Sequence, residues 1–167
     1  NGTKLYTGDI LVTKTQGHTV IVTSGEAREV PFTPPAKVTN AVYRLYNTSN
    51  GEHFYTKNAS ERNNLIKGGW KYEGVAWKAP KLSTSPVYRL VNTFHMFTTS
   101  KAEKDNLIKN GWKYEGVGFY SNTKHACKIY RLYNTQSGDH LLTASVAEKN
   151  NLIKAGWTNE GVACYGL

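Results

Sequence analysis

The feature that most constrains the fold is a stretch of sequence that occurs three times. The copies begin at Val42, Val87 and Ile129, so their starts lie 45 and then 42 residues apart. They read VYRLYNTSNGEHFYTKNASERNNLIKGGWKYEGVAW, VYRLVNTFHMFTTSKAEKDNLIKNGWKYEGVGF and IYRLYNTQSGDHLLTASVAEKNNLIKAGWTNEGVAC. A gap of three residues between Asn92 and His95, in repeat two, accounts for the difference in spacing.

A fixed period of this length is typical of repeat architectures, in which each unit buries its apolar face against its neighbours. The units are repeat one (residues 42–86), repeat two (87–128) and repeat three (129–167). An open solenoid is expected to begin and end with atypical polar repeats, and none is visible in this sequence. We therefore predict one closed domain whose three units are related by pseudo-threefold symmetry.

Each repeat predicts two strands, a short helix and a third strand. The first strand, at Val42–Asn47, is rich in β-branched and aromatic residues. A turn that contains Gly51 then leads to a second strand at His53–Thr56 in repeat one, or His140–Thr143 in repeat three. Repeat two shortens this hairpin. The third strand is EGVAW, EGVGF or EGVAC.

Sequence signals mark the start and the end of each predicted helix. The start has a capping box, in which the cap side chain binds the third helical N–H and a glutamate reaches back to the cap. The pairs are Asn58 with Glu61, Ser100 with Glu103, and Ser145 with Glu148. At the end, a glycine suits a left-handed position, and the tryptophan after it can pack on a helix leucine, as in a Schellman motif. These residues are Leu65, Gly69 and Trp70, then Leu107, Gly111 and Trp112, then Leu152, Gly156 and Trp157.

The repeat, with its pattern YRLYN…GEHFYT…ER…L…GW.YEGVAF, resembles uncharacterised tandem repeats of secreted and phage-derived peptidoglycan hydrolases from Gram-positive systems. The resemblance covers nearly the whole of all three copies, and it implies attachment to lytic enzymes and a targeting role. A ring of three β-rich units also resembles a β-trefoil. We therefore expect a mainly β domain of three ββαβ repeats, with one short helix in each, closed in a β-trefoil-like arrangement.

The first forty residues differ from the repeats. GDILVT and HTVIVTSG predict a hairpin within residues 1–25, and the proline-containing residues 26–41 predict an extended linker. The hairpin resembles the closing half of a papain-like NlpC-type or CHAP-type peptidoglycan hydrolase domain, in which His18 matches the catalytic histidine. The family's nucleophilic cysteine lies well upstream of this segment. The resemblance therefore implies a remnant of a catalytic domain, and we expect no hydrolysis by this chain.

The net charge of the chain is +9, of which the repeats carry about +8. This charge favours polyanionic partners, such as the teichoic acids of a Gram-positive wall, although it also serves solubility. The sequence has no zinc-finger or helix-turn-helix spacing, so nucleic acid is not an expected partner. No apolar run approaches the length that spans a membrane, so we expect no membrane insertion.

The sequence contains two cysteines, Cys127 just before repeat three and Cys164 near its end. If they lie on neighbouring strands they could form one disulfide. Two free, buried thiols are equally compatible with the sequence, since two cysteines do not make a disulfide framework. The spacing does not suggest a metal site.

Polar residues shared by all three repeats are candidates for either the fold or a site. The arginines Arg44, Arg89 and Arg131 can pair with Glu73, Glu115 and Glu160 between the first and last strands, or they can bind wall phosphates. The histidines His53, His95 and His140 can bind neighbouring backbone groups or meet as a zinc site. For both sets we favour the structural interpretation, and we predict no metal and no cofactor.

Aromatic residues are the main candidates for ligand contact, because tyrosine and tryptophan rings stack on the apolar faces of sugars. Some tyrosine positions vary between repeats, which suggests that the fold does not require them. We expect the ligand site to include Tyr46, Tyr55, Tyr72, Tyr114 and Tyr133, together with Arg44, Arg89, Arg131, His53 and His140. Trp70, Trp112 and Trp157 are expected to be helix-end core residues.

Together these patterns predict non-catalytic binding to bacterial cell-wall glycan or teichoic acid, as the targeting domain of a peptidoglycan hydrolase or phage endolysin. The expected location is outside the cell at the bacterial wall, or release from the host cytoplasm for a phage protein. The alternatives are a structural or oligomerising module that associates with the full-length lysin, and a glycan-active enzyme. No pair of acids and no nucleophile–histidine arrangement supports the enzyme.

Overall fold

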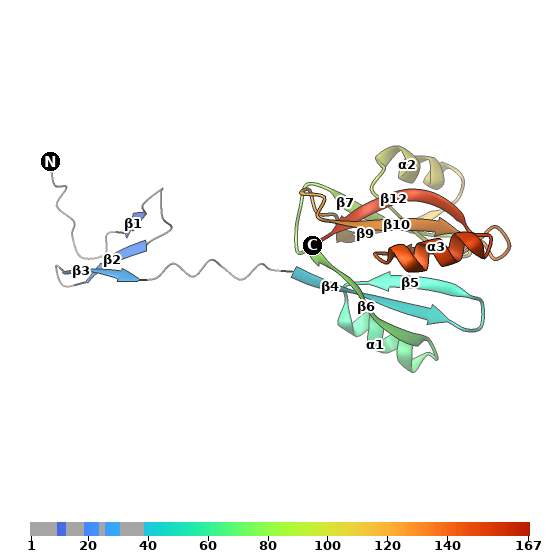
Figure 1. The fold of residues 1–167 in the computed structure, drawn as a ribbon, viewed down its shortest axis with the longest axis horizontal. Helices are drawn as coiled ribbons and strands as arrows, with labels where there is room; N and C mark the ends of the chain where they lie inside the picture. The colour runs from blue at the N-terminus through green and yellow to red at the C-terminus, as the bar shows by residue number, and fades with distance from the viewer. Residues whose placement is uncertain (1–9, 13–18, 24–25, 31–38) are drawn as a thin grey trace. The chain divides into compact units, whose positions relative to one another are not determined.

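The structure is a computed structural model and describes residues 10–12, 19–23, 26–30 and 39–167 of the chain. It divides into two compact units, Asn1–Lys37 and Val38–Leu167. Figure 1 shows the strands of the first unit and the strands and helices of the second.

The first unit contains three short strands: β1 (Ile10–Val12), β2 (Thr19–Thr23) and β3 (Glu26–Val30). The predicted hairpin is confirmed, because β1 pairs with β2 in an antiparallel register that places Leu11 opposite Val20. The prediction of a linker over residues 26–41 was wrong at its two ends. β3 pairs with β2, and residues from Thr39 onward already form a strand of the second unit. His18 and residues 31–38 lie outside the described residues.

The second unit is mainly β, with the predicted order of two strands, a helix and a strand in every repeat. Repeat one forms β4 (Thr39–Asn47), β5 (Glu52–Thr56), α1 (Ala59–Lys67) and β6 (Lys71–Pro80). Repeat two forms β7 (Pro86–Val91), β8 (His95–Thr98), α2 (Lys101–Lys109) and β9 (Lys113–Tyr120). Repeat three forms β10 (Cys127–Tyr133), β11 (His140–Thr143), α3 (Val146–Lys154) and β12 (Thr158–Gly166).

Each repeat builds its own three-stranded antiparallel sheet, with the first strand in the middle. The orders are β5-β4-β6, β8-β7-β9 and β11-β10-β12. The three sheets lie side by side around a shared core, and each helix lies beside the sheet of its own repeat (Figure 1). None of the helices among the described residues is both long enough and apolar enough to cross a membrane.

Each helix begins with half of the predicted capping box. The side chain of Ser100 accepts from the backbone N–H of Glu103, and Asn58 and Ser145 act in the same way. The prediction that the glutamate reaches back to the cap was wrong, because a threonine takes that role. The backbone N–H of Ser100 donates to Thr98 Oγ1 at 2.9 Å, which leaves the Glu103 carboxylate free for another partner.

The helix ends follow the predicted Schellman motif. In repeat two, Gly111 has a φ of +86° and donates to the carbonyl of Ile108, while Trp112 donates to the carbonyl of Leu107. The other two repeats make the same pair of bonds. A residue with a side chain is strained at this φ, so the glycine fixes where the helix ends and where the following strand begins.

The core consists of equivalent residues from the three repeats. One set is Tyr55, Phe97 and Leu142, and a second is Trp77, Phe119 and Cys164. Tyr55 is 0% exposed, and its hydroxyl donates to the carbonyl of Leu142 at 2.8 Å. The prediction that Tyr55 contacts ligand was therefore wrong. The position varies because three side chains share one interior space, in which a large residue in one repeat compensates a small one in another.

Two adjacent glycines test the helix-end geometry in repeat one. Gly69 has a φ of +91°, whereas Gly68 has an ordinary φ of −79° and corresponds to Ala155 of repeat three. Gly69→Ala is expected to lower the free energy of unfolding by about 1 kcal/mol. Gly68→Ala is expected to leave it unchanged or raise it slightly. Urea denaturation of both variants measures the difference, and equal effects would contradict the assignment.

Candidate ligand-binding site

An arginine held between two glutamates joins each repeat to the next. Arg89 Nε lies 3.1 Å from Glu115 of its own repeat, and Arg89 Nη1 lies 3.0 Å from Glu61 on α1 of repeat one. The predicted pairing between first and last strands is thus confirmed in each repeat. The glutamate from the preceding helix was not predicted. The other arginines repeat the arrangement, as Arg131 with Glu160 and Glu103, and Arg44 with Glu73 and Glu148.

These contacts run in one direction around the unit. A helix glutamate of repeat one binds the arginine of repeat two, repeat two binds repeat three, and repeat three binds repeat one. The arginine side chains are only 13–20% exposed. Because each guanidinium already faces two carboxylates, the arginines serve the interfaces, and they are poorly placed to bind wall phosphates as well.

The electrostatics of the helix glutamates agree with this role. Burial alone would raise the pKa of Glu103, but hydrogen bonds from Arg131 and Thr98 outweigh burial and hold the pKa below its usual value. The pKa of Glu148 is lowered in the same way, by Arg44 and Thr143 against the effect of burial. Both carboxylates are therefore charged in the folded protein at neutral pH.

Two of the three equivalent histidines are bound by an acid of the preceding repeat. The backbone N–H of His95 donates to Glu52 Oε1 at 2.9 Å, and its ring Nδ1 donates to the same oxygen at 2.6 Å. Asp139 holds His53 through both of its oxygens, at 3.0 Å from the backbone nitrogen and 2.7 Å from Nδ1. The acids are buried, with Glu52 only 4% exposed and Asp139 0% exposed.

The third histidine, His140, has no such acid. The residue of repeat two that corresponds to Glu52 and Asp139 is Phe94, which stands immediately before His95 where the hairpin is three residues shorter. The Nδ1 atom of His140 is buried, and no residue in the described part of the chain forms a hydrogen bond with it. Its Nε2 atom lies 3.7 Å from Glu160.

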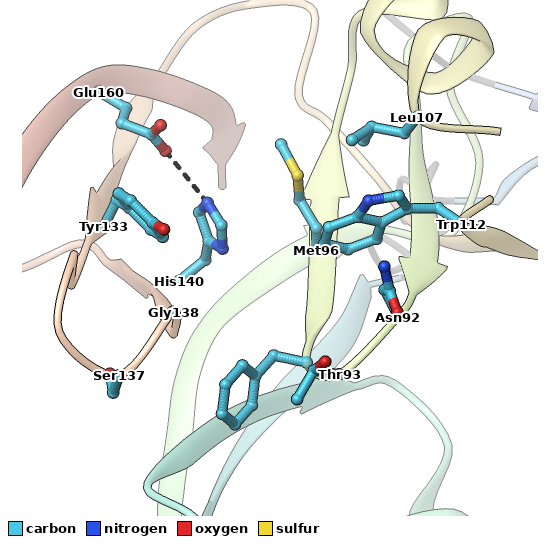
Figure 2. Close-up of a pocket in the computed structure, with 11 residues that line it drawn as sticks. Asn92, Thr93, Met96, Leu107, Trp112, Tyr133, Ser137, Gly138, His140 and Glu160 are labelled. Carbon is cyan, nitrogen blue, oxygen red and sulfur yellow. Dashed lines mark ion pairs between the residues drawn. The ribbon is translucent and has the colours of Figure 1, made fainter. Parts of the chain in front are cut away.

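A cavity of about 510 Å³ lies at this interface between repeats two and three. In Figure 2, Tyr133, His140 and Glu160 lie on one side of it, and Met96, Leu107 and Trp112 lie on the other. Asn92 and Ser137 from the two hairpin turns also contribute to the lining. Its volume is in the range of small-molecule sites, and its lining combines apolar and aromatic surface with a few polar groups.

Tyr133 and Tyr46 occupy equivalent positions in different surroundings. The ring of Tyr133 stacks on His140 at 4.7 Å and lines the cavity. The ring of Tyr46 lies 4.9 Å from His53, the histidine that Asp139 holds. The structure thus brings Tyr133 and His140 of the predicted site together, and it places Tyr46 and His53 at a different interface.

The remaining predicted tyrosines lie on the outer surface. Tyr72 and Tyr114 are 39% and 40% exposed, and each meets Tyr43 or Tyr88 edge to face. A cation from the neighbouring helix lies over each pair, Arg62 in repeat one and Lys104 in repeat two. These contacts pack the helix on its sheet and leave Tyr72 and Tyr114 partly exposed to solvent.

The three histidines do not form a metal site. Within residues 39–167, no cluster of three or more histidine, cysteine, aspartate or glutamate side chains is arranged to hold a metal ion. Cys127 and Cys164 are both free thiols, so the disulfide alternative is wrong, but only Cys164 is buried and Cys127 is partly exposed. Burial raises the pKa of Cys164 to about 12, which makes its thiol a core group of low reactivity.

Replacing Arg131 tests the interface ion pairs. Arg131→Met leaves Glu103 and Glu160 without their counter-ion, so we expect the free energy of unfolding to fall by about 2 kcal/mol or more. The Arg131→Lys variant is expected to have a stability between those of the unmodified chain and Arg131→Met, since lysine keeps the charge but cannot reproduce the forked contacts. Lys128→Met, an exposed lysine on the same strand, is the matched control. If chemical denaturation shows that Lys128→Met lowers the free energy of unfolding as much as Arg131→Met does, the role of Arg131 in the interface is contradicted.

The stability of the domain should depend on the charge of His140. Burial holds the pKa of His140 below its ordinary 6.5, so protonation favours the unfolded chain. The free energy of unfolding is therefore expected to fall as pH decreases below about 6.5. His140→Gln should remove this contribution. The measurement is the pH dependence of unfolding for both proteins, and parallel curves between pH 8 and 5 would contradict the prediction.

Comparison with known proteins gives one match. A family described as "Domain of unknown function (DUF5648)" matches residues 41–167, which is most of the chain and includes all three repeats. No curated protein and no solved structure matches the chain. The match includes every residue that lines the cavity. On the extent of this match, the chain belongs to the DUF5648 family.

Proposed function

We propose that the chain is a non-catalytic binding module for bacterial cell-wall glycan, and that the cavity between repeats two and three is its ligand site. The observation that carries the proposal is the lining of this cavity. Tyr133 and Trp112 supply aromatic surface, while Asn92, His140 and Glu160 supply polar atoms. Flat apolar surface beside a few hydrogen-bonding groups suits a sugar ring, which has apolar faces and polar edges.

The distribution of charge supports binding rather than catalysis. A general acid for glycoside hydrolysis needs a carboxyl group whose pKa is raised. The pKa of Glu103 is lowered instead, and Glu160 is held by Arg131 at 2.7 Å. Glu160, the acid that lines the cavity, is therefore committed to an arginine. For this reason we favour a binding module over a glycan-active enzyme.

The positive charge of the repeats has a separate role in the proposal. The arginines shared by the repeats are committed to glutamates, so attraction to anionic wall polymers falls to exposed lysines. Such attraction speeds encounter with the wall and weakens as salt rises. In this proposal the exposed lysines attract teichoic acid over the whole surface, whereas the glycan binds in the cavity.

The proposal also includes the symmetry of the unit. The same arginine–glutamate contacts occur at all three interfaces in the same direction. They support three repeats related by rotations of about 120° in a β-trefoil-like ring. The domain would then carry three related interfaces, of which the one between repeats two and three has been opened for ligand by the short hairpin.

The test of the function is binding of purified Gram-positive walls by the full chain. We expect Tyr133→Ala to weaken binding about 10-fold, because it removes the ring that lines the cavity. Tyr46→Ala is the matched control, since Tyr46 occupies the equivalent position beside an acid-bound histidine. It should bind as well as the unmodified chain. Circular dichroism establishes that both variants are folded.

Two results would overturn the proposal. The first is that the folded chain does not bind walls, and the second is that both tyrosine variants bind like the unmodified chain. Equal losses in the two variants would place the ligand outside this cavity. A series of salt concentrations completes the experiment, with weaker binding expected at higher salt.

A further inference from the structure

The three histidines lie among equivalent charged groups, and one of these groups is missing at a single interface. At two interfaces the set comprises a histidine, an arginine, two glutamates and one further acid from the preceding hairpin, namely Glu52 or Asp139. At the third interface the histidine, the arginine and the two glutamates are present as His140, Arg131, Glu103 and Glu160. The position of the fifth member belongs to Phe94.

We propose that a carboxylate of the ligand takes this position and binds His140 as Glu52 binds His95 and Asp139 binds His53. The inference rests on the proposed function, since it names the ligand class of the same cavity. The ligand would be a sugar that carries a carboxylate, with its ring against Tyr133 and Trp112. An adjacent peptide carboxylate offers the same chemistry, and the experiment separates the two sources.

The surroundings of His140 can accept this negative charge. Among the residues that the structure describes, the cavity interface has one carboxylate fewer than either of the other two, so an anionic ligand restores the set of charges that the fold already holds twice. The buried Nδ1 of His140 also lacks a partner in the described part of the chain. A buried polar atom without a hydrogen bond is costly, and a ligand oxygen removes that cost.

A flexible side chain, Met96, can give a carboxylate access to His140. Met96 lies between His140 and Trp112 in Figure 2, at the position that Phe54 occupies beside His95. Phe54 is a rigid ring that lies 4.6 Å from the His95 ring. Methionine is unbranched and has three rotatable bonds. Its side chain can therefore turn aside and uncover the histidine at the one interface where a ligand must enter.

The length of the hairpins explains why the acid cannot come from the chain itself. In repeat one, five residues (48–52) separate Asn47 from His53 and end in Glu52. In repeat two only Thr93 and Phe94 separate Asn92 from His95. The ring of Phe94 instead lies against Gly138, whose added Cβ would meet that ring at 3.4 Å. The shorter turn thus removes the acid and leaves the opening that the ligand uses.

The experiment uses two sugars that differ in the relevant group. N-acetylmuramic acid carries a lactyl carboxylate that N-acetylglucosamine lacks. We expect the full chain to bind the acid at least about 10-fold more tightly than the neutral sugar, because a carboxylate adds a charge-assisted hydrogen bond. N-acetyl-D-alanine, a carboxylate without a sugar, is the third probe. Tighter binding of this third probe supports a peptide carboxylate as the source.

The histidine signals in NMR spectra give a readout that locates the carboxylate. Binding should raise the pKa of His140, on which Glu160, Arg131, Asp139 and Glu103 also act. His53 and His95 are internal controls, because each already has an acid partner. A shift of all three histidines alike, or of none, would overturn the inference.

A hairpin graft tests the same idea without relying on a loss of folding. Thr93 and Phe94 are replaced by Thr-Ser-Asn-Gly-Glu, the turn of repeat one, so that the chain supplies its own acid to His140. A second graft ends in Gln in place of Glu. The Glu graft should be at least as stable as the unmodified chain and lose the preference for N-acetylmuramic acid. It should bind that acid more weakly than the Gln graft does.

The outcomes separate this inference from the proposed function. Equal affinity for the acidic and neutral sugars, or no binding of any probe, would overturn the carboxylate. Wall binding that survives in the Glu graft at full strength would likewise overturn it, and would leave glycan binding standing. The folded, unmodified chain could instead fail to bind walls and still bind the carboxylate probes selectively. That result would overturn the wall-binding function and leave the carboxylate site standing.

Discussion

The arrangement of the repeats depends on one arginine in each of them, held between two glutamates. One glutamate comes from the last strand of the same repeat and the other from the helix of the preceding repeat. Removing any member leaves a partly buried charge without its partner, so the contact fixes how neighbouring repeats meet. The threonine that satisfies the cap N–H makes this possible, since it releases the helix glutamate from the capping role.

This framework allows the repeats to differ elsewhere. In the core, Tyr55, Phe97 and Leu142 fill one space with side chains of different sizes. At the hairpins, repeat two has lost three residues and the acid that repeats one and three place on a histidine. The first difference is compensated by packing. The second leaves His140 Nδ1, beside a cavity, without a hydrogen-bond partner among the described residues, and for that reason we place the ligand there.

Much of the fold could be predicted from the sequence because its determinants are local. The caps, the Schellman glycines and the strand order each depend on residues a few positions apart. The pairing of Arg89 with Glu61 was not predicted, because it links different repeats. Tyr55 was misjudged because equivalent positions of a repeat can meet in one core. The missing acid was visible as Phe94 in the alignment of the repeats, but only the structure shows that Glu52 and Asp139 bind histidines.

The most direct test of the ligand's location is a map of backbone amide chemical shifts during titration with soluble wall glycan fragments. We predict that the largest changes fall on the cavity segments, around residues 92–96, Trp112 and residues 133–140. The equivalent segments of the other two interfaces should change little. Equal changes at all three interfaces, or changes confined to the outer tyrosines Tyr72 and Tyr114, would contradict the account.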